Sequence, residues 1–200
     1  MMSFDKRAIR QELRARRKGL SPAFVTAAGH AVCGRLSAFP PYNAAASVLV
    51  YLACEYEVPT TGLIERAVAS NKTVYLPHTA SGAMVRWTPG DPLVIARGGV
   101  AEPVGAPLSG ACPAIALIPV VGWDWQGTRL GRGGGFYDRL LADLPPTIRV
   151  GLAYDFQQVA SLPRDSWDIA LDYVITEQRV IRCGWGEERR PALLQEGGLR

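Results

Sequence analysis

Two uninterrupted apolar segments place the strongest constraint on the fold of this chain. SVLVYLA at 47–53 and AIALIPVV at 114–121 are dominated by Val, Ile, Leu and Ala and contain no charged residue. A strand that faces water on one side alternates apolar and polar residues, whereas an unbroken apolar run is typical of a strand buried on both faces. Such strands belong to sheets that helices cover on both sides. The two segments therefore predict an α/β fold.

Further strands and helices are expected to alternate along the chain. The other expected strands lie at 73–77, 83–88, 149–154 and 171–176, with an edge strand at 180–182. The expected helices lie at 3–18, 23–38, 61–70 and 136–143. Ser3 and Thr60 can cap two of these helices, and Pro40 and Pro41 stop a third. This alternation predicts a three-layer α/β/α sandwich with a mostly parallel sheet.

The length of 200 residues suits one domain with a sizeable core. Residues 89–113 hold five prolines and five glycines with little periodicity. We interpret them as an ordered segment wrapping the surface; a linker between two domains is the alternative, although neither flank alone looks self-sufficient. We predict a single domain at 1–182 and a polar tail at 183–200.

Several function classes find no support in the composition. No apolar run reaches the roughly 18 residues of a membrane-spanning helix, and the charged N-terminus lacks the apolar core of a secretory signal. The four cysteines are widely separated and form no C-x-x-C pair. We therefore expect a cytoplasmic protein with reduced thiols and without a zinc site.

Positive charge is concentrated in the first expected helix. Against the single acid Glu12, residues 6–18 hold seven cations: Lys6, Arg7, Arg10, Arg14, Arg16, Arg17 and Lys18. Such a cluster attracts nucleic acid, anionic lipid or a polyphosphate ligand, and composition does not choose among them.

The segment 127–139 carries the most distinctive local pattern. Three successive glycines give a backbone whose N–H groups can converge on an oxyanion at the start of the following helix. Arg129 and Arg132 add charge suited to phosphate oxygens. The pattern is neither a Walker loop nor a dinucleotide fingerprint. It indicates a phosphate site, with a flexible turn bearing solvated arginines as the alternative.

Acidic residues near these segments are candidates for a metal or substrate site. Asp138 could ligate Mg²⁺ beside phosphates, or could only complement the helix dipole. One of Asp165, Asp168 and Asp172 could complete the metal site, although loop acids often only form turns. Glu57 follows the strand at 47–53; its position favours a solvated loop acid, with a binding group as the alternative.

The segment LGRGGGFYDR at 130–139, preceded by IPVVGWDWQGTR at 118–129, resembles the signature of the 5-formyltetrahydrofolate cyclo-ligase family. Other segments resemble the family in order and spacing at 6–21, 51–67, 151–157 and 162–176. The resemblance covers about residues 4–182.

The resemblance implies a role for each matching position. ATP would contact Lys6, Arg7, Ala8, Ile9, Arg10, Arg129, Leu130, Gly131, Arg132, Gly133, Gly134, Gly135, Phe136 and Tyr137. The folate would contact Leu52, Glu57, Arg132, Gly133, Gly134, Gly135 and Phe136, the last standing where Tyr is more usual. Asp138 and Asp168 would hold Mg²⁺, and Arg132 and Asp138 would act in catalysis.

The family's reaction would use ATP and Mg²⁺ to close 5-formyltetrahydrofolate into 5,10-methenyltetrahydrofolate, releasing ADP and phosphate. The γ-phosphoryl group would move to the formyl oxygen, and N10 would then attack the activated carbon. The protein would be a monomer or weak homodimer with no nucleic-acid or membrane partner. The alternatives are a non-catalytic relative that binds nucleotide or folate, and a nucleic-acid-binding protein that uses the basic helix.

Overall fold

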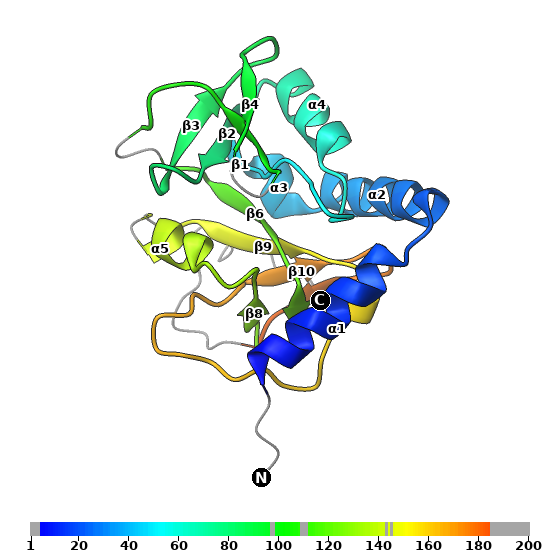
Figure 1. Cartoon of the computed structure of the whole chain (residues 1–200). Helices are drawn as coiled ribbons and strands as arrows, with labels where there is room; N and C mark the ends of the chain where they lie inside the picture. Colours follow the sequence, from blue (N-terminus) through cyan, green and yellow to red (C-terminus); the bar gives the residue numbers. More distant parts are fainter. Residues whose placement is uncertain (1–4, 97–98, 109–111, 143, 145, 185–200) are drawn as a thin grey trace.

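A mixed sheet runs through the centre of the computed structural model, which describes residues 5–96, 99–108, 112–142, 144 and 146–184 (Figure 1). Within these residues the sheet has seven strands in the order β11-β10-β9-β6-β1-β2-β3. Their bounds are β1 (Ser47–Leu49), β2 (Thr73–His78), β3 (Ala83–Trp87), β6 (Ile115–Pro119), β9 (Ile148–Leu152), β10 (Tyr173–Ile175) and β11 (Val180–Arg182). The inner strands are parallel, and β3 and β11 close the two edges antiparallel to their neighbours.

Helices cover both faces of this sheet, which confirms the predicted three-layer sandwich. One face carries α2 (Pro22–Ser37), α3 (Pro40–Ala44) and α4 (Thr61–Ala69), and the other carries the short α5 (Phe136–Ala142) (Figure 1). Val48 packs in the core on the first face and Leu49 in the core on the second. The run at 47–53 is thus apolar throughout because both of its faces are buried, as predicted.

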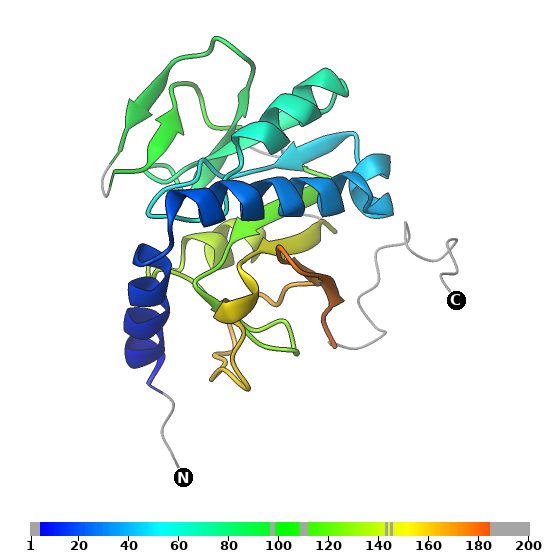
Figure 2. The same cartoon turned by 90° about the vertical axis from the view of Figure 1, so that its right-hand side faces the viewer.

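The first helix, α1 (Lys6–Lys18), stands outside the helical layer formed by α2 and α4 (Figure 2). Its Leu13 side chain packs so closely on Gly122 that a Cβ at that glycine would lie 2.8 Å from it. The cap of α1 differs from the prediction. Asp5 is the N-cap and its side chain accepts a hydrogen bond from the Arg7 backbone N–H, while Ser3 lies outside the described residues.

The chain connections create a crevice between β1 and β6. From β1 the chain crosses to β2 on one side, and it later returns to β6 on the other side. At such a reversal the loops leaving the two carboxyl ends diverge and leave room for a ligand. A ligand site is therefore expected at the segments that follow β1 and β6.

Residues after β1 fold back toward the sheet. Thr60 occupies the N-cap position of α4, but its hydroxyl donates to the Tyr51 carbonyl at 2.6 Å instead of capping the helix. Glu55 and Tyr56 adopt left-handed backbone conformations with φ of 48° and 60°. Two consecutive non-glycine residues in this region are strained, as is common where a loop positions functional groups.

The proline- and glycine-rich segment at 89–113 contains a hairpin that was not predicted. The strands β4 (Leu93–Ile95) and β5 (Ala101–Pro103) pair antiparallel, and β5 lies against β2. The helix α3 was also missed, because Pro40 and Pro41 not only follow α2 but begin this short helix. Of the predicted tail at 183–200, only residues 183–184 are described. None of the described helices is both long and apolar enough to cross a membrane.

Candidate functional site

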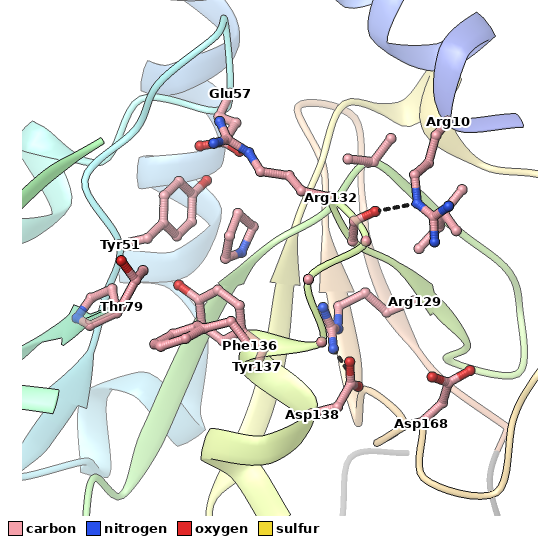
Figure 3. Close-up of a pocket in the computed structure, with 18 of the residues that line it drawn as sticks. Arg10, Tyr51, Glu57, Thr79, Arg129, Arg132, Phe136, Tyr137, Asp138 and Asp168 are labelled. Atoms are coloured by element: carbon pink, nitrogen blue, oxygen red, sulfur yellow. Dashed lines mark hydrogen bonds and ion pairs between the residues drawn. The ribbon is translucent and has the colours of Figure 1, made fainter. Parts of the chain in front are cut away.

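A cavity of about 320 Å³ lies at the carboxyl ends of β1 and β6, in the crevice that the topology creates. Figure 3 shows it between the loop after β1, the start of α1 and the segment leading into α5. Fifteen residues predicted for the site line it: Lys6, Arg10, Leu52, Glu57, Arg129, Leu130, Gly131, Arg132, Gly133, Gly134, Gly135, Phe136, Tyr137, Asp138 and Asp168. Arg7, Ala8 and Ile9 are not among the lining residues, and their contact with ATP stays a prediction.

A small hairpin presents the glycine-rich segment to the cavity. The strands β7 (Gly122–Trp123) and β8 (Arg129–Leu130) pair antiparallel, an element that sequence analysis missed because each strand is only two residues long. Its turn requires glycine at Gly127, where φ is +82° and a Cβ would lie 2.4 Å from the Leu171 carbonyl oxygen.

The backbone between β8 and α5 is open toward a ligand. Gly133 and Gly135 have φ of +105° and +62°, and no atom lies within 4 Å of the position of a Cβ at Gly134. On one side the loop is fastened to α1, because Arg10 Nε donates to the Gly131 carbonyl at 2.8 Å. Bare peptide groups next to fixed arginines are suited to binding an oxyanion.

Arg129 and Asp138 form an ion pair on the wall of the cavity. Arg129 Nη2 donates to Asp138 Oδ1 at 2.6 Å, and the Ile169 backbone N–H donates to the same oxygen at 3.2 Å (Figure 3). The Arg129 side chain is 4% exposed, yet its Nε has no hydrogen-bond partner within the described ranges. A buried guanidinium N–H without a partner fits an arriving phosphate oxygen.

Lys6 links α1 to the loop that carries Asp165 and Asp168. Its Nζ lies 2.7 Å from Asp165 Oδ2 and 2.9 Å from Asp168 Oδ2. Burial acts to raise the pKa of Asp168, but the Asp165 backbone N–H and the Lys6 ammonium outweigh it and lower that pKa. Asp168 is therefore a carboxylate at neutral pH.

The donor set fits Mg²⁺ better than a transition metal. Asp138 and Asp168 both line the cavity, and Mg²⁺ in nucleotide sites usually takes one or two carboxylates plus phosphate oxygens and water. No group of three or more His, Cys, Asp or Glu suited to a metal occurs in the described part of the chain. Of the two remaining candidate ligands, Asp165 lines the cavity and pairs with Lys6 at 2.7 Å, whereas Asp172 pairs with Arg149 at 2.8 Å and does not line the cavity.

Glu57 lies at the opposite end of the cavity from Asp168 (Figure 3). It is 6% exposed, so the interpretation of Glu57 as a solvated loop acid is wrong. Arg132 reaches across from the glycine-rich segment and places its Nε 3.3 Å from Glu57 Oε1. The Cys54 backbone N–H donates to Oε2 at 3.2 Å.

Several residues that line the cavity were not predicted from the sequence, among them Tyr51, Cys54, Thr79, Val100 and Trp167. Tyr51 and Cys54 follow β1 and Thr79 follows β2, so position after a strand was the available signal. Burial, together with the nearby Glu57, raises the pKa of Cys54 to about 11. Burial likewise raises the pKa of Tyr137. Both groups are therefore protonated at neutral pH.

The chain matches a known protein family. Residues 2–177 match the model of the 5-formyltetrahydrofolate cyclo-ligase family. The chain belongs to this family. The match confirms the resemblance seen in the sequence and, with it, the prediction of an enzyme.

The chain aligns with relatives in the cyclo-ligase family over nearly their whole length. A 5-formyltetrahydrofolate cyclo-ligase of Escherichia coli K12 is 36% identical over 84% of this chain and 98% of its own. One from Haemophilus influenzae is 33% identical over 86% and 97%. The solved structure of Aquifex aeolicus 5,10-methenyltetrahydrofolate synthetase is 30% identical, covers 95% of this chain and 98% of its own, and superposes with a TM-score of 0.80.

Proposed function

We propose that this chain uses ATP and Mg²⁺ to cyclise 5-formyltetrahydrofolate into 5,10-methenyltetrahydrofolate, releasing ADP and phosphate. The observation that carries the proposal is that one cavity joins a basic, glycine-lined end to a buried carboxylate, Glu57. Family membership supplies the substrate class, and the cavity offers a place for each of the two substrates side by side.

The triphosphate of ATP would lie at the basic end. Lys6, Arg10 and Arg129 stand there, and the peptide groups of residues 131–135 face the same space. Mg²⁺, which Asp138 and Asp168 would hold, supplies neutralisation of phosphate charge when bound. The Arg129–Asp138 pair would orient both side chains before substrate arrives, which lowers the reorganisation needed at the reacting phosphate.

The folate would lie at the end that contains Glu57. A carboxylate there can accept hydrogen bonds from the amino-pyrimidine edge of the pterin. Leu52 and Phe136 supply apolar surface for the ring. Arg132 spans the distance between the loop and Glu57, so its guanidinium is placed near both substrates.

The chemistry requires positioning more than a protein nucleophile. The formyl oxygen takes the γ-phosphoryl group of ATP, which turns a poor leaving group into phosphate. The N10 amine attacks the activated carbon, loses its proton, and the carbon–oxygen bond breaks as phosphate leaves. Cys54 lies in the cavity but remains a thiol at neutral pH because of its raised pKa, so it does not compete as a nucleophile.

We also infer a cytoplasmic monomer or weak homodimer that does not bind nucleic acid or membranes. Part of the basic helix is already paired within the chain: Arg14 Nη2 donates to Glu55 at 2.7 Å, and Lys6 pairs with Asp165. Pairing with internal acids reduces the positive charge that this helix presents to an external polyanion.

The test is a spectrophotometric assay of the purified chain with ATP, Mg²⁺ and 5-formyltetrahydrofolate, omitting one component at a time. The expected result is the absorbance of the conjugated methenyl product with matching ADP release, and neither without ATP. A folded sample that yields neither signal would refute the proposal. Folate binding measured by calorimetry without ATP consumption would instead support the non-catalytic relative.

A further inference from the structure

Arg17 is a buried cation on a helix that is otherwise largely exposed. Only Leu13 and Arg17 of α1 are buried, four residues apart and therefore on one face. Arg17 is 2% exposed, although helical spacing would suit a second apolar residue at this position. A guanidinium does not lose its proton in proteins. The helix thus carries a permanent positive charge into the interior.

The hydrogen bonds of Arg17 do not compensate for its burial. Its Nε and Nη2 have no hydrogen-bond partner among the residues that the structure describes. Nη2 lies 3.9 Å from Glu57 Oε1 and 3.9 Å from Glu55 Oε2, within ion-pair range but too far for hydrogen bonds. A buried charge held this way contributes little to stability, and an apolar side chain would often serve better. Its charge therefore points to a role at the neighbouring carboxylates.

Arg132 and Arg17 approach the same oxygen of Glu57 from different elements. The Arg132 side chain is 33% exposed, comes from the glycine-rich segment and lines the cavity. The Arg17 side chain comes from α1 and does not line the cavity. Arg132 can therefore turn toward a bound substrate, whereas Arg17 is fixed by its burial.

Other titratable groups face Glu57 from the surrounding elements. They are Cys54 and Glu55 in its own loop, Tyr51 after β1, Tyr137 on α5 and Tyr154 after β9. Three of these groups, Tyr51, Tyr137 and Tyr154, are uncharged at neutral pH, because burial raises their pKa. Glu55 carries a like charge. Arg17 and Arg132 are thus the cations within ion-pair distance of Glu57 in the described part of the chain.

We propose that Arg17 is the fixed counter-ion of Glu57, a positioning residue that holds this carboxylate in place when Arg132 turns to the substrates. What Glu57 binds rests on the proposed function, whereas the charge relation rests on the ion-pair geometry. Without Arg17, a Glu57 released by Arg132 would be a buried charge with no cation at hand, which is strongly unfavourable. The carboxylate would then turn away from the position in which it can accept hydrogen bonds from the amino group of a pterin.

The first experiment compares Arg17→Met, which removes the charge, with Arg17→Lys, which keeps it. We expect Arg17→Met to raise the KM for 5-formyltetrahydrofolate about tenfold and the KM for ATP less than twofold, a loss confined to one substrate. Arg17→Lys should restore most of the folate KM.

The matched control is Arg16→Met, since Arg16 is exposed on the same helix, lies over the Phe156 ring and forms no ion pair with Glu57 among the described residues. It should leave both KM values unchanged. An Arg17→Met variant with the original folate KM would overturn the proposal. So would equal rises in both KM values with no recovery in Arg17→Lys, because that pattern describes a structural residue. Should Arg17→Met not fold, Arg17→Gln serves the same comparison.

A second measurement does not depend on turnover. The dissociation constant of 5-formyltetrahydrofolate, measured by calorimetry without ATP, should rise about tenfold in Arg17→Met and stay unchanged in Arg16→Met. An unchanged constant in Arg17→Met would overturn the counter-ion role. If the wild-type protein binds the folate without cyclising it, and Arg17→Met still weakens that binding, the proposed function is refuted and the inference stands.

Discussion

Individual side chains in the cavity are paired in advance of any substrate. Among the described residues, four ion pairs line it: Arg129–Asp138, Lys6–Asp165, Lys6–Asp168 and Arg132–Glu57. Pairing holds each group in a defined orientation, and a polyanionic ligand can exchange places with the carboxylates at little additional desolvation. A single substitution here is therefore expected to change catalysis more than stability.

Asp138→Asn tests the carboxylate nearest the proposed phosphate site. Asn keeps an oxygen that can accept from Arg129 and from the Ile169 N–H, so the fold should persist. The lost charge should lower kcat by about 100-fold, the usual effect of removing one transition-state stabiliser. Steady-state kinetics with a melting curve would measure both. Asp172→Asn is the control, since Asp172 pairs with Arg149 outside the cavity and should leave kcat unchanged. Full activity of Asp138→Asn would remove Asp138 from the metal site.

Arg132→Ala tests the side chain that joins the two ends of the cavity. The variant loses the ion pair with Glu57 and the proposed contact with phosphate, so KM for ATP or for folate should rise about tenfold. Initial-rate measurements with each substrate varied in turn would show it. Unchanged kinetics would leave Arg132 without a role in binding.

Cys54 offers a prediction that follows from its environment. Burial and the neighbouring Glu57 raise its pKa to about 11, so at pH 7.5 only a very small fraction is thiolate. Iodoacetamide should modify Cys54 about 100-fold more slowly than a thiol of ordinary pKa, and the rate should rise with pH up to about 11. Mass spectrometry can follow the reaction, with the exposed Cys112 as internal reference. Equal rates at pH 7.5 would contradict the assigned pKa.

At the scale of elements, the β7–β8 hairpin determines where the glycine-rich segment lies. Gly127→Ala would place a methyl group 2.4 Å from the Leu171 carbonyl oxygen at a positive φ, and should destabilise the fold by about 2–4 kcal/mol. Gly134→Ala meets open space and should change stability by less than about 0.5 kcal/mol. Denaturant unfolding of both variants measures the contrast. Equal stability would mean that the hairpin tolerates a different turn.

The elements also show what could be read from the chain and what could not. The buried strands and the glycine-rich segment could be predicted from local sequence, because apolar runs and successive glycines have few other uses. The burial of Arg17 could not be predicted, because nothing in the sequence distinguishes Arg17 from the other cations of residues 6–18. Glu57 looked like a surface acid because its partners, Arg17 and Arg132, lie 40 and 75 residues away. The β7–β8 hairpin escaped notice because two-residue strands have no periodicity.

At the scale of the whole molecule, ligands should stabilise the fold because three distant segments meet around one cavity. ADP with Mg²⁺ at 100 times its dissociation constant would add about 2.7 kcal/mol to the free energy of unfolding. For a chain of this length that corresponds to a rise in Tm of about 5 °C or more. Differential scanning fluorimetry with and without Mg²⁺ would detect it. No shift at saturating ADP would argue against a nucleotide site.

The attachment of α1 to the cavity has a consequence for biosynthesis. Arg10 contacts Gly131 and Lys6 contacts Asp168, at separations of 121 and 162 residues along the chain. Because a ribosome makes the chain from its amino end, α1 emerges before the segments that contain Gly131 and Asp168. Lys6 and Arg10 must therefore stay without these partners until 162 and 121 further residues have been made.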